Sequence, residues 1–152
     1  TLIVFAVGVS MGSVLLSTKG AEWLSLNTLE AMGLSDMPLI GIIMVLSLFN
    51  ILIHLGFASA TSLSSAFIPI VIALVISMGA TDFSGPGLVL IQQFVISFGF
   101  LLPVSAPQNM LAYGTGAFTS KDLLKSGIPI TLIGYLLIIL FSMTYWQWVG
   151  LL

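Results

Sequence analysis

The stretch Gly-Phe-Ala-Ser-Ala-Thr-Ser-Leu-Ser-Ser, residues 56–65, interrupts an apolar segment that runs from Leu39 to Met78. That segment contains no Asp, Glu, Lys or Arg, so the interruption is made of small residues and hydroxyls rather than charges. Backbone N–H and C=O groups cannot stay unpaired in hydrocarbon, so a helix break at membrane depth persists only where protein or a wet cavity covers it. The stretch therefore predicts two helices that meet at a covered break.

The composition places the chain in a membrane. Of its 152 residues, 59% are hydrophobic and 5% are charged, and the mean hydropathy is +1.23. Soluble domains carry about 25% charged residues, so this chain cannot cover a water-facing surface. It has no cysteine and a net charge of −2, which excludes disulfides and thiolate metal sites and leaves no basic patch for nucleic acid. We expect an all-α, multi-pass protein of the cell inner membrane or the plasma membrane.

The order of apolar runs and charges predicts three regions. Residues 1–36 contain an apolar run up to Ser17, typical of a membrane helix, and then an amphipathic stretch that predicts an interfacial helix. A plain loop is the alternative for that stretch. Residues 37–80 predict two helices joined at the polar stretch, and residues 81–152 predict a broken helix and a last transmembrane helix from Ile128. Because the chain opens with Thr1 inside an apolar run, we expect it to be part of a longer protein.

Residues 37–80 fit either a re-entrant helical hairpin or two full spans, which together need about 40 residues. The composition of the turn favours the hairpin, because a turn in water usually carries charged residues or Asn. At a buried turn, the carbonyl end of the first helix favours a cation. The N-terminal N–H groups of the second helix favour an anion. A small-residue face that only packs helices together is the alternative.

A second interruption, Pro-Val-Ser-Ala-Pro-Gln-Asn at residues 103–109, breaks the next apolar run. Each proline removes an N–H and clashes with the preceding turn, so two prolines four residues apart cannot lie in one continuous helix. We expect a helix from Gly87 to Leu102 and a short continuation from Asn109 to Gly116. The freed carbonyls need partners, and a desolvated cation is one candidate. A proline kink covered by neighbouring helices is the alternative.

Four other polar side chains fall within apolar runs. His54 and Asn50 lie one turn apart on the first hairpin helix, and an intramembrane polar residue is a candidate functional residue. A proton role for His54 is one hypothesis; a packing role is the other, because no acidic partner is present. Gln92 and Gln93 face different sides of their helix, so we expect at least one to bond a neighbouring helix. No enzyme motif occurs, and we expect no enzymatic activity.

The two interruptions resemble those of the divalent anion/sodium symporter family, the INDY-type carriers of dicarboxylates, citrate and sulfate. That family has a Ser-Asn-Thr motif at the tip of its hairpin, and the matching residues are Ser59, Ala60 and Thr61. Its broken helix has Pro-Val-x-Thr-Pro-Pro-Asn. Residues 103–109 match this run, with Ala106 in place of Thr and Gln108 in place of the second Pro. The resemblance covers essentially the whole chain, which looks like the C-terminal half of an inverted-repeat transporter.

The resemblance implies sodium-coupled uptake of a di- or tricarboxylate or a similar anion by alternating access. It implies that the coupling ion, Na+, is bound at Ser59, Thr61, Ser105, Ala106 and Pro107, and that the substrate contacts Ser59, Ala60, Thr61, Pro107 and Asn109. The implied partners are a small-molecule anion, the N-terminal inverted repeat of the same protein, the lipid bilayer and a second copy in a homodimer.

This sequence departs from the family pattern at the anion site. Ala60 and Ala106 remove two side-chain donors, which puts the usual C4-dicarboxylate in doubt. Two alternatives to the carrier stay open. One is a non-transporting membrane subunit, in which both interruptions only pack helices. The other is a channel or proton carrier that uses His54.

Overall fold

A computed structural model describes residues 37–57, 59–78 and 84–152, together with scattered positions before residue 37. These ranges contain helices and no strand, in agreement with the all-α prediction. The elements are α3 (Leu39–His54), α4 (Ala60–Ser77), α5 (Ser84–Ile96), the 3-10 helix η1 (Pro103–Ser105), α6 (Pro107–Gly114), α7 (Ser120–Met143) and α8 (Tyr145–Trp148). The membrane helix and the interfacial helix predicted for residues 1–36 lie outside the described residues.

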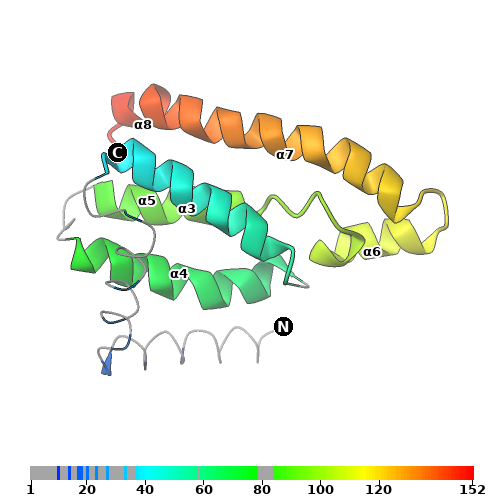
Figure 1. The fold of residues 1–152 in the computed structure, drawn as a ribbon, viewed down its shortest axis with the longest axis horizontal. Coiled ribbons are helices and arrows are strands. Elements are labelled where there is room, and N and C mark those ends of the chain that lie inside the picture. The colour runs from blue at the N-terminus through cyan, green and yellow to red at the C-terminus, as the bar shows by residue number, and fades with distance from the viewer. Residues whose placement is uncertain are drawn as a thin grey trace.

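Four helices form the body of the described structure. In Figure 1, α3, α4, α5 and α7 lie with their long axes in roughly one direction, and α6 extends away from them at one end. α5 packs against both α3 and α4, while α7 packs against α3. The core lies between these helices, and its most deeply buried side chains include Ile42, Ile43, Leu63, Val71, Leu74, Leu88, Ile91, Val95 and Ile96.

The two hairpin helices begin and end close to where the sequence predicts. We expected the first to end near Leu55 and the second to begin near Ser62, and the structure has α3 ending at His54 and α4 beginning at Ala60. Ser59 is the N-cap of α4: its backbone is extended, and its hydroxyl accepts a hydrogen bond from the Ser62 N–H at 3.1 Å. A serine at this position satisfies one of the N–H groups that a helix start leaves unpaired.

The helix predicted for Gly87 to Leu102 is wrong at its end. α5 stops at Ile96, because the N–H groups of Ser97 and Phe98 turn back to the carbonyls of Phe94 and Val95 at 3.0 and 2.9 Å. Such i to i+3 bonds tighten and close a helix. The chain is then irregular up to η1, so the break is longer than the two prolines alone require.

The last helix is also longer than predicted at its start. We expected a polar segment before Ile128, yet α7 begins at Ser120. Thr119 and Asp122 form a capping box, in which the Thr119 hydroxyl accepts from the Asp122 N–H at 3.4 Å and the Asp122 carboxylate accepts from the Thr119 N–H at 2.9 Å. This reciprocal pair starts a helix inside a polar segment.

At its C-terminal end, α7 stops at Met143 rather than continuing towards Leu152, and the short α8 follows. With 24 residues, α7 is about 36 Å long. Among the described residues, the helical stretch Ser120–Trp148 is the one that is long and apolar enough to cross a membrane, whereas α3, α4 and α5 are shorter apolar helices.

Two glycines let α7 approach the irregular chain that follows α5. A Cβ atom at Gly127 would overlap the carbonyl oxygen of Phe100, and one at Gly134 would lie 2.8 Å from the ring of Phe98. Membrane helices pack closely through small residues of this kind, because van der Waals contact replaces the hydrophobic effect there. We call the chain between α5 and α6, residues 97–106, the broken segment. Gly127 and Gly134 therefore fix the position of the broken segment relative to α7.

Replacing Gly127 by Ala is expected to destabilise the protein by about 1–3 kcal/mol, because the added methyl group meets a backbone oxygen that cannot move aside cheaply. Thermal unfolding of the full-length protein in detergent measures this change. Gly114→Ala is the matched control, since nothing lies within 4 Å of its Cβ position. Equal unfolding temperatures for the two variants would contradict the close approach.

Candidate functional site

The end of α3 lies against the broken segment. His54 is the last residue of α3, and only 3% of its surface is exposed. A Cβ atom at Gly99 would lie 3.4 Å from His54 Nε2 and 3.4 Å from Ser105 Cβ, so these three residues are immediate neighbours. The end of α3, just before the first interruption, therefore lies against Gly99 and against Ser105 of the second interruption.

Backbone N–H groups in the turn that follows α3 donate hydrogen bonds to the last carbonyls of that helix. The N–H groups of Leu55, Gly56 and Phe57 donate to the carbonyls of residues 52, 53 and 54 at 3.2, 3.0 and 3.1 Å. We expected the carbonyl end of α3 to favour a cation. The carbonyls of residues 52, 53 and 54 thus each accept one hydrogen bond from the turn, and each keeps a second lone pair.

The three residues that match the family's tip motif differ in their surroundings. Ser59 is half-buried, and its hydroxyl both accepts from the Ser62 N–H and donates to the Ser62 hydroxyl at 3.0 Å. A hydroxyl has two acceptor lone pairs, so Ser59 keeps one for a ligand. Ala60 is half-buried and Thr61 is exposed. The residue of this region that lies against the broken segment is His54.

The broken segment has an extended residue at each end of η1. Leu102 has φ −123° and ψ 146°, and Ala106 has φ −149° and ψ 142°. Ser105 and Ala106 are buried, whereas Pro107 is exposed and begins α6, slightly before the predicted start at Asn109. The predicted sodium ligands Ser105, Ala106 and Pro107 thus lie where one helix has ended and the next begins.

Asn109 bonds its own broken segment. Its amide nitrogen donates to the carbonyl of Gly99 at 2.7 Å and faces the carbonyl of Leu102 at 3.4 Å. Sequence reasoning gave Asn109 only the substrate-contact role that the resemblance implies. Sequence reasoning missed the site's other neighbour, Gly99, because only the fold brings its carbonyl to the Asn109 amide.

A buried polar cluster holds α3 and α5 together. The Asn50 amide donates to the backbone carbonyl and the side-chain oxygen of Gln92 at 3.1 and 3.2 Å, and the Gln92 amide donates to Ser47 at 3.1 Å. All three side chains are fully buried. Ser64 of α4 donates to Gln93 at 2.9 Å. The prediction that at least one glutamine bonds a neighbouring helix is confirmed for both.

Some buried polar atoms on this face of α3 have no hydrogen bond. They are Oδ1 of Asn50 and both ring nitrogens of His54, and in the described part of the chain Oγ1 of Thr131 is the other such side-chain atom. The His54 ring faces the Ser105 backbone without reaching hydrogen-bond geometry. An unpaired buried polar group costs about 1–3 kcal/mol.

The donor set fits a hard monovalent cation better than a transition metal. The described residues contain no group of three or more His, Cys, Asp or Glu that could hold a metal ion. What gathers at the two interruptions is hydroxyl and carbonyl oxygen, which suits hard cations. The buried unpaired atoms nearby show that this region is polar inside an otherwise apolar body.

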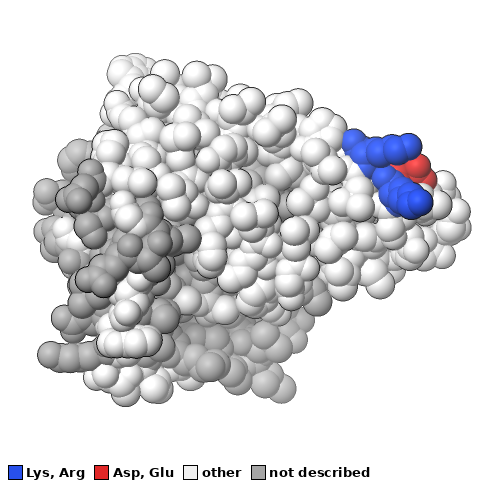
Figure 2. All heavy atoms as spheres, in the orientation of Figure 1, with Lys and Arg blue, Asp and Glu red and all other residues white. Residues whose placement is uncertain are grey.

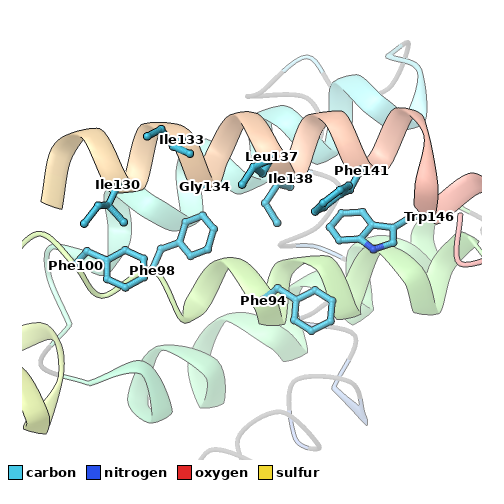
Figure 3. Close-up of a pocket in the computed structure, with 10 residues that line it drawn as sticks. All are labelled: Phe94, Phe98, Phe100, Ile130, Ile133, Gly134, Leu137, Ile138, Phe141 and Trp146. Atoms are coloured by element: carbon cyan, nitrogen blue, oxygen red, sulfur yellow. The ribbon is translucent and has the colours of Figure 1, made fainter.

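A cavity of about 410 Å³ beside α7 lies apart from this site. Figure 3 shows its lining side chains, which come from α5, from the chain after α5, from α7 and from Trp146. They are Phe94, Phe98, Phe100, Ile130, Ile133, Leu137, Ile138, Phe141 and Trp146, together with Gly134. Such a lining offers hardly any polar group to an ion.

Comparisons with known proteins were made with the whole chain. Residues 1–152 match the family described as the sodium:sulfate symporter transmembrane region. A membrane protein of Cupriavidus necator is 45% identical over 99% of this chain, and the match covers 29% of that protein. An uncharacterized transporter of Escherichia coli is 30% identical over 86% of the chain and 21% of its own length.

The human Na+/dicarboxylate cotransporter 3 is 35% identical over 60% of this chain and 15% of its own length. The chain thus spans less than a third of the length of the curated relatives it matches. These relatives are described as transporters or as a membrane protein, and none of the three is described as an enzyme.

Gln92→Met is expected to destabilise the protein by about 1 kcal/mol, because it keeps the side chain's length but removes the bonds to Ser47 and from the Asn50 amide. Gln93→Met is the matched control. It removes a single bond at an exposed position, and we expect a loss below about 0.5 kcal/mol. Thermal unfolding in detergent compares the two, and an equal loss would contradict the assigned role of the buried cluster.

Proposed function

Because this chain belongs to the sodium:sulfate symporter transmembrane family, we propose that it is the C-terminal half of a sodium-coupled secondary active transporter. The observation that carries the proposal is the contact of His54, at the end of α3, with Gly99 and Ser105 of the broken segment. This contact sets the end of the helix that precedes the first interruption against the second interruption, and it supports a site shared by the two. The protein would be multi-pass, in the cell inner membrane or the plasma membrane.

The proposed sodium ion lies between the hairpin turn and the broken segment. Its ligands are oxygens of Ser59, Thr61, Ser105, Ala106 and Pro107. Pro107 has no N–H, so it cannot satisfy the carbonyl of Val104, three residues earlier, as a helical residue would. Backbone oxygens freed in this way near the break are available to a cation, whose charge in turn favours an anion close by.

The proposed anion binds at the start of α4. The first residues of α4 present N–H groups towards the turn, and the positive end of the helix dipole favours a carboxylate or sulfate there. The Ser62 N–H is already bonded to Ser59, which leaves the N–H groups of Ala60 and Thr61. With alanine at 60 and 106, the side chains offer less than in the family's motif. We therefore propose an anion held mainly by backbone groups and by sodium.

Two features support a hairpin tip that lies within the membrane. α3 has 16 residues and is about 24 Å long, shorter than the hydrocarbon thickness of about 30 Å. In Figure 1, α6 and the start of α7 extend beyond the turn between α3 and α4. In Figure 2, the coloured basic and acidic side chains gather at that far end. The turn thus stops short of the charged end of the molecule.

Alternating access would move the hairpin, α5 and α6 as one body, because buried bonds join α5 to α3 and an exposed bond joins α5 to α4. The N-terminal inverted repeat would supply the matching half of the site, and a second copy of the protein would complete a homodimer. Both partners lie in the rest of the full-length protein and its assembly, and both are proposals from the family.

Uptake by the full-length protein, measured with dicarboxylates, citrate and sulfate in the presence and absence of sodium, tests this function. We expect uptake of at least one anion only with sodium. A non-transporting subunit would take up none of them under either condition. Uptake that survives His54→Ala with an unchanged pH dependence would remove the alternative of a proton carrier built on His54.

Ser59→Ala and Thr61→Val are expected to raise the sodium concentration for half-maximal uptake about tenfold each, because each removes one oxygen ligand, worth about 1.4 kcal/mol. Ser65→Ala is the control: this hydroxyl lies in the same polar run but donates to the Thr61 carbonyl within α4. Expression of all three variants is expected to match the parent protein. Unchanged sodium dependence in both test variants would count against the site.

Ala60→Asn restores the side-chain donor that the family's tip motif has at this position. We expect it to lower the KM for a C4-dicarboxylate about tenfold, the value of one charge-assisted hydrogen bond of roughly 1.5 kcal/mol. Initial uptake rates at saturating sodium give the KM. Ala66→Asn, at an exposed position further along α4, is the control. No change in dicarboxylate KM would show that the anion does not meet residue 60.

A further inference from the structure

We propose that Asn109 is a positioning residue that holds the broken segment in its ion-binding shape and does not contact the transported anion. The inference rests on the proposed function, because it concerns the same site, and it changes the role that the family resemblance implies for this residue. The observation behind it is the pair of carbonyls, Gly99 and Leu102, that the Asn109 amide meets at 2.7 and 3.4 Å.

The Asn109 side chain supplies an N–H donor that the two prolines lack. Between the end of α5 and the start of α6, the carbonyls need hydrogen-bond partners, and neither Pro103 nor Pro107 has an N–H to offer. Leaving such carbonyls unpaired in a membrane is costly. The Ser105 N–H reaches Leu102 at 3.2 Å, and Asn109 is the residue that reaches back across the break to Gly99.

The chemistry of the amide argues against contact with an anion. An asparagine side chain has two N–H donors on one nitrogen and an oxygen that only accepts. The nitrogen of Asn109 is directed at two carbonyls. What remains is the oxygen, and an ionised carboxylate or a sulfate also only accepts hydrogen bonds. Two acceptors repel each other, so Asn109 in this position cannot hold such an anion.

Gly99 links the Asn109 hydrogen bond to His54 and Ser105. Its carbonyl accepts from Asn109, and its Cα side faces His54 Nε2 and Ser105. The Asn109 bond therefore fixes the residue that lies between the end of α3 and the buried Ser105. Loss of the bond would let the Gly99 carbonyl turn towards other donors, and Ser105 would shift with it. The sodium ligands would be disturbed before any anion contact.

The test uses full-length protein with a single cysteine at Val104, a residue of the broken segment that is 43% exposed. This chain contains no cysteine, so only cysteines elsewhere in the full-length protein need replacement. Three quantities are measured for Asn109→Leu, for the milder Asn109→Ser and for the control Gln108→Leu. They are the maleimide labelling rate at position 104, the sodium concentration for half-maximal uptake and the anion KM at saturating sodium.

For both Asn109 variants we expect labelling at position 104 to become at least threefold faster and the half-maximal sodium concentration to rise at least fivefold. The anion KM at saturating sodium is expected to stay within twofold, and Gln108→Leu is expected to change none of the three. If Asn109→Leu does not fold, the serine variant decides.

A raised anion KM with unchanged labelling and sodium dependence would overturn the inference and restore Asn109 as an anion ligand. Absence of sodium-dependent uptake in the parent protein would instead overturn the proposed function. In that case the labelling rates alone test Asn109: faster labelling supports the positioning role, and an unchanged rate refutes it.

Discussion

The structure depends on one constraint: a backbone carbonyl or N–H that leaves a helix inside a membrane must find another partner. At the first interruption, the turn after α3 and the Ser59 cap of α4 meet this constraint locally. At the second, prolines remove donors, and the partner comes from the side chain of Asn109 across the break. Where local partners run out, the remaining oxygens are those that we propose as ligands for an ion. The candidate site is thus a consequence of how the two breaks satisfy their backbone.

A second consequence is mechanical. Gln92 ties α5 to α3, Gln93 ties it to Ser64 of α4, and two glycines of α7 hold the chain that follows α5. α5 is therefore joined to α3 by buried hydrogen bonds and to α4 by an exposed one, and not by apolar packing alone. Hydrogen bonds of this kind specify a single arrangement of membrane helices.

The sequence predicted the helix ends that are set by local residue types, such as proline and small polar residues. It missed the helix ends that are set by other hydrogen bonds and contacts in the fold. The turn at residues 55–59 and the break at the prolines follow from local residue types, so α3, α4 and the start of α6 lie close to their predicted positions. The early end of α5 does not follow from any proline, because Ser97 and Phe98 bond back to the preceding turn. The start of α7 was missed because the Thr119–Asp122 capping box reads as a polar loop. Asn109 could be named from the motif, but its partner Gly99, ten residues away, could be found only in three dimensions.

The most direct measurement is an experimental density map of the full-length protein, prepared in a bilayer mimetic with sodium and again without it. The account predicts a sodium-dependent peak between the turn at residues 55–59 and residues 105–107, with that turn below the level of the lipid head groups. A turn at the membrane surface, or a sodium peak elsewhere with residues 105–107 unoccupied, would contradict it.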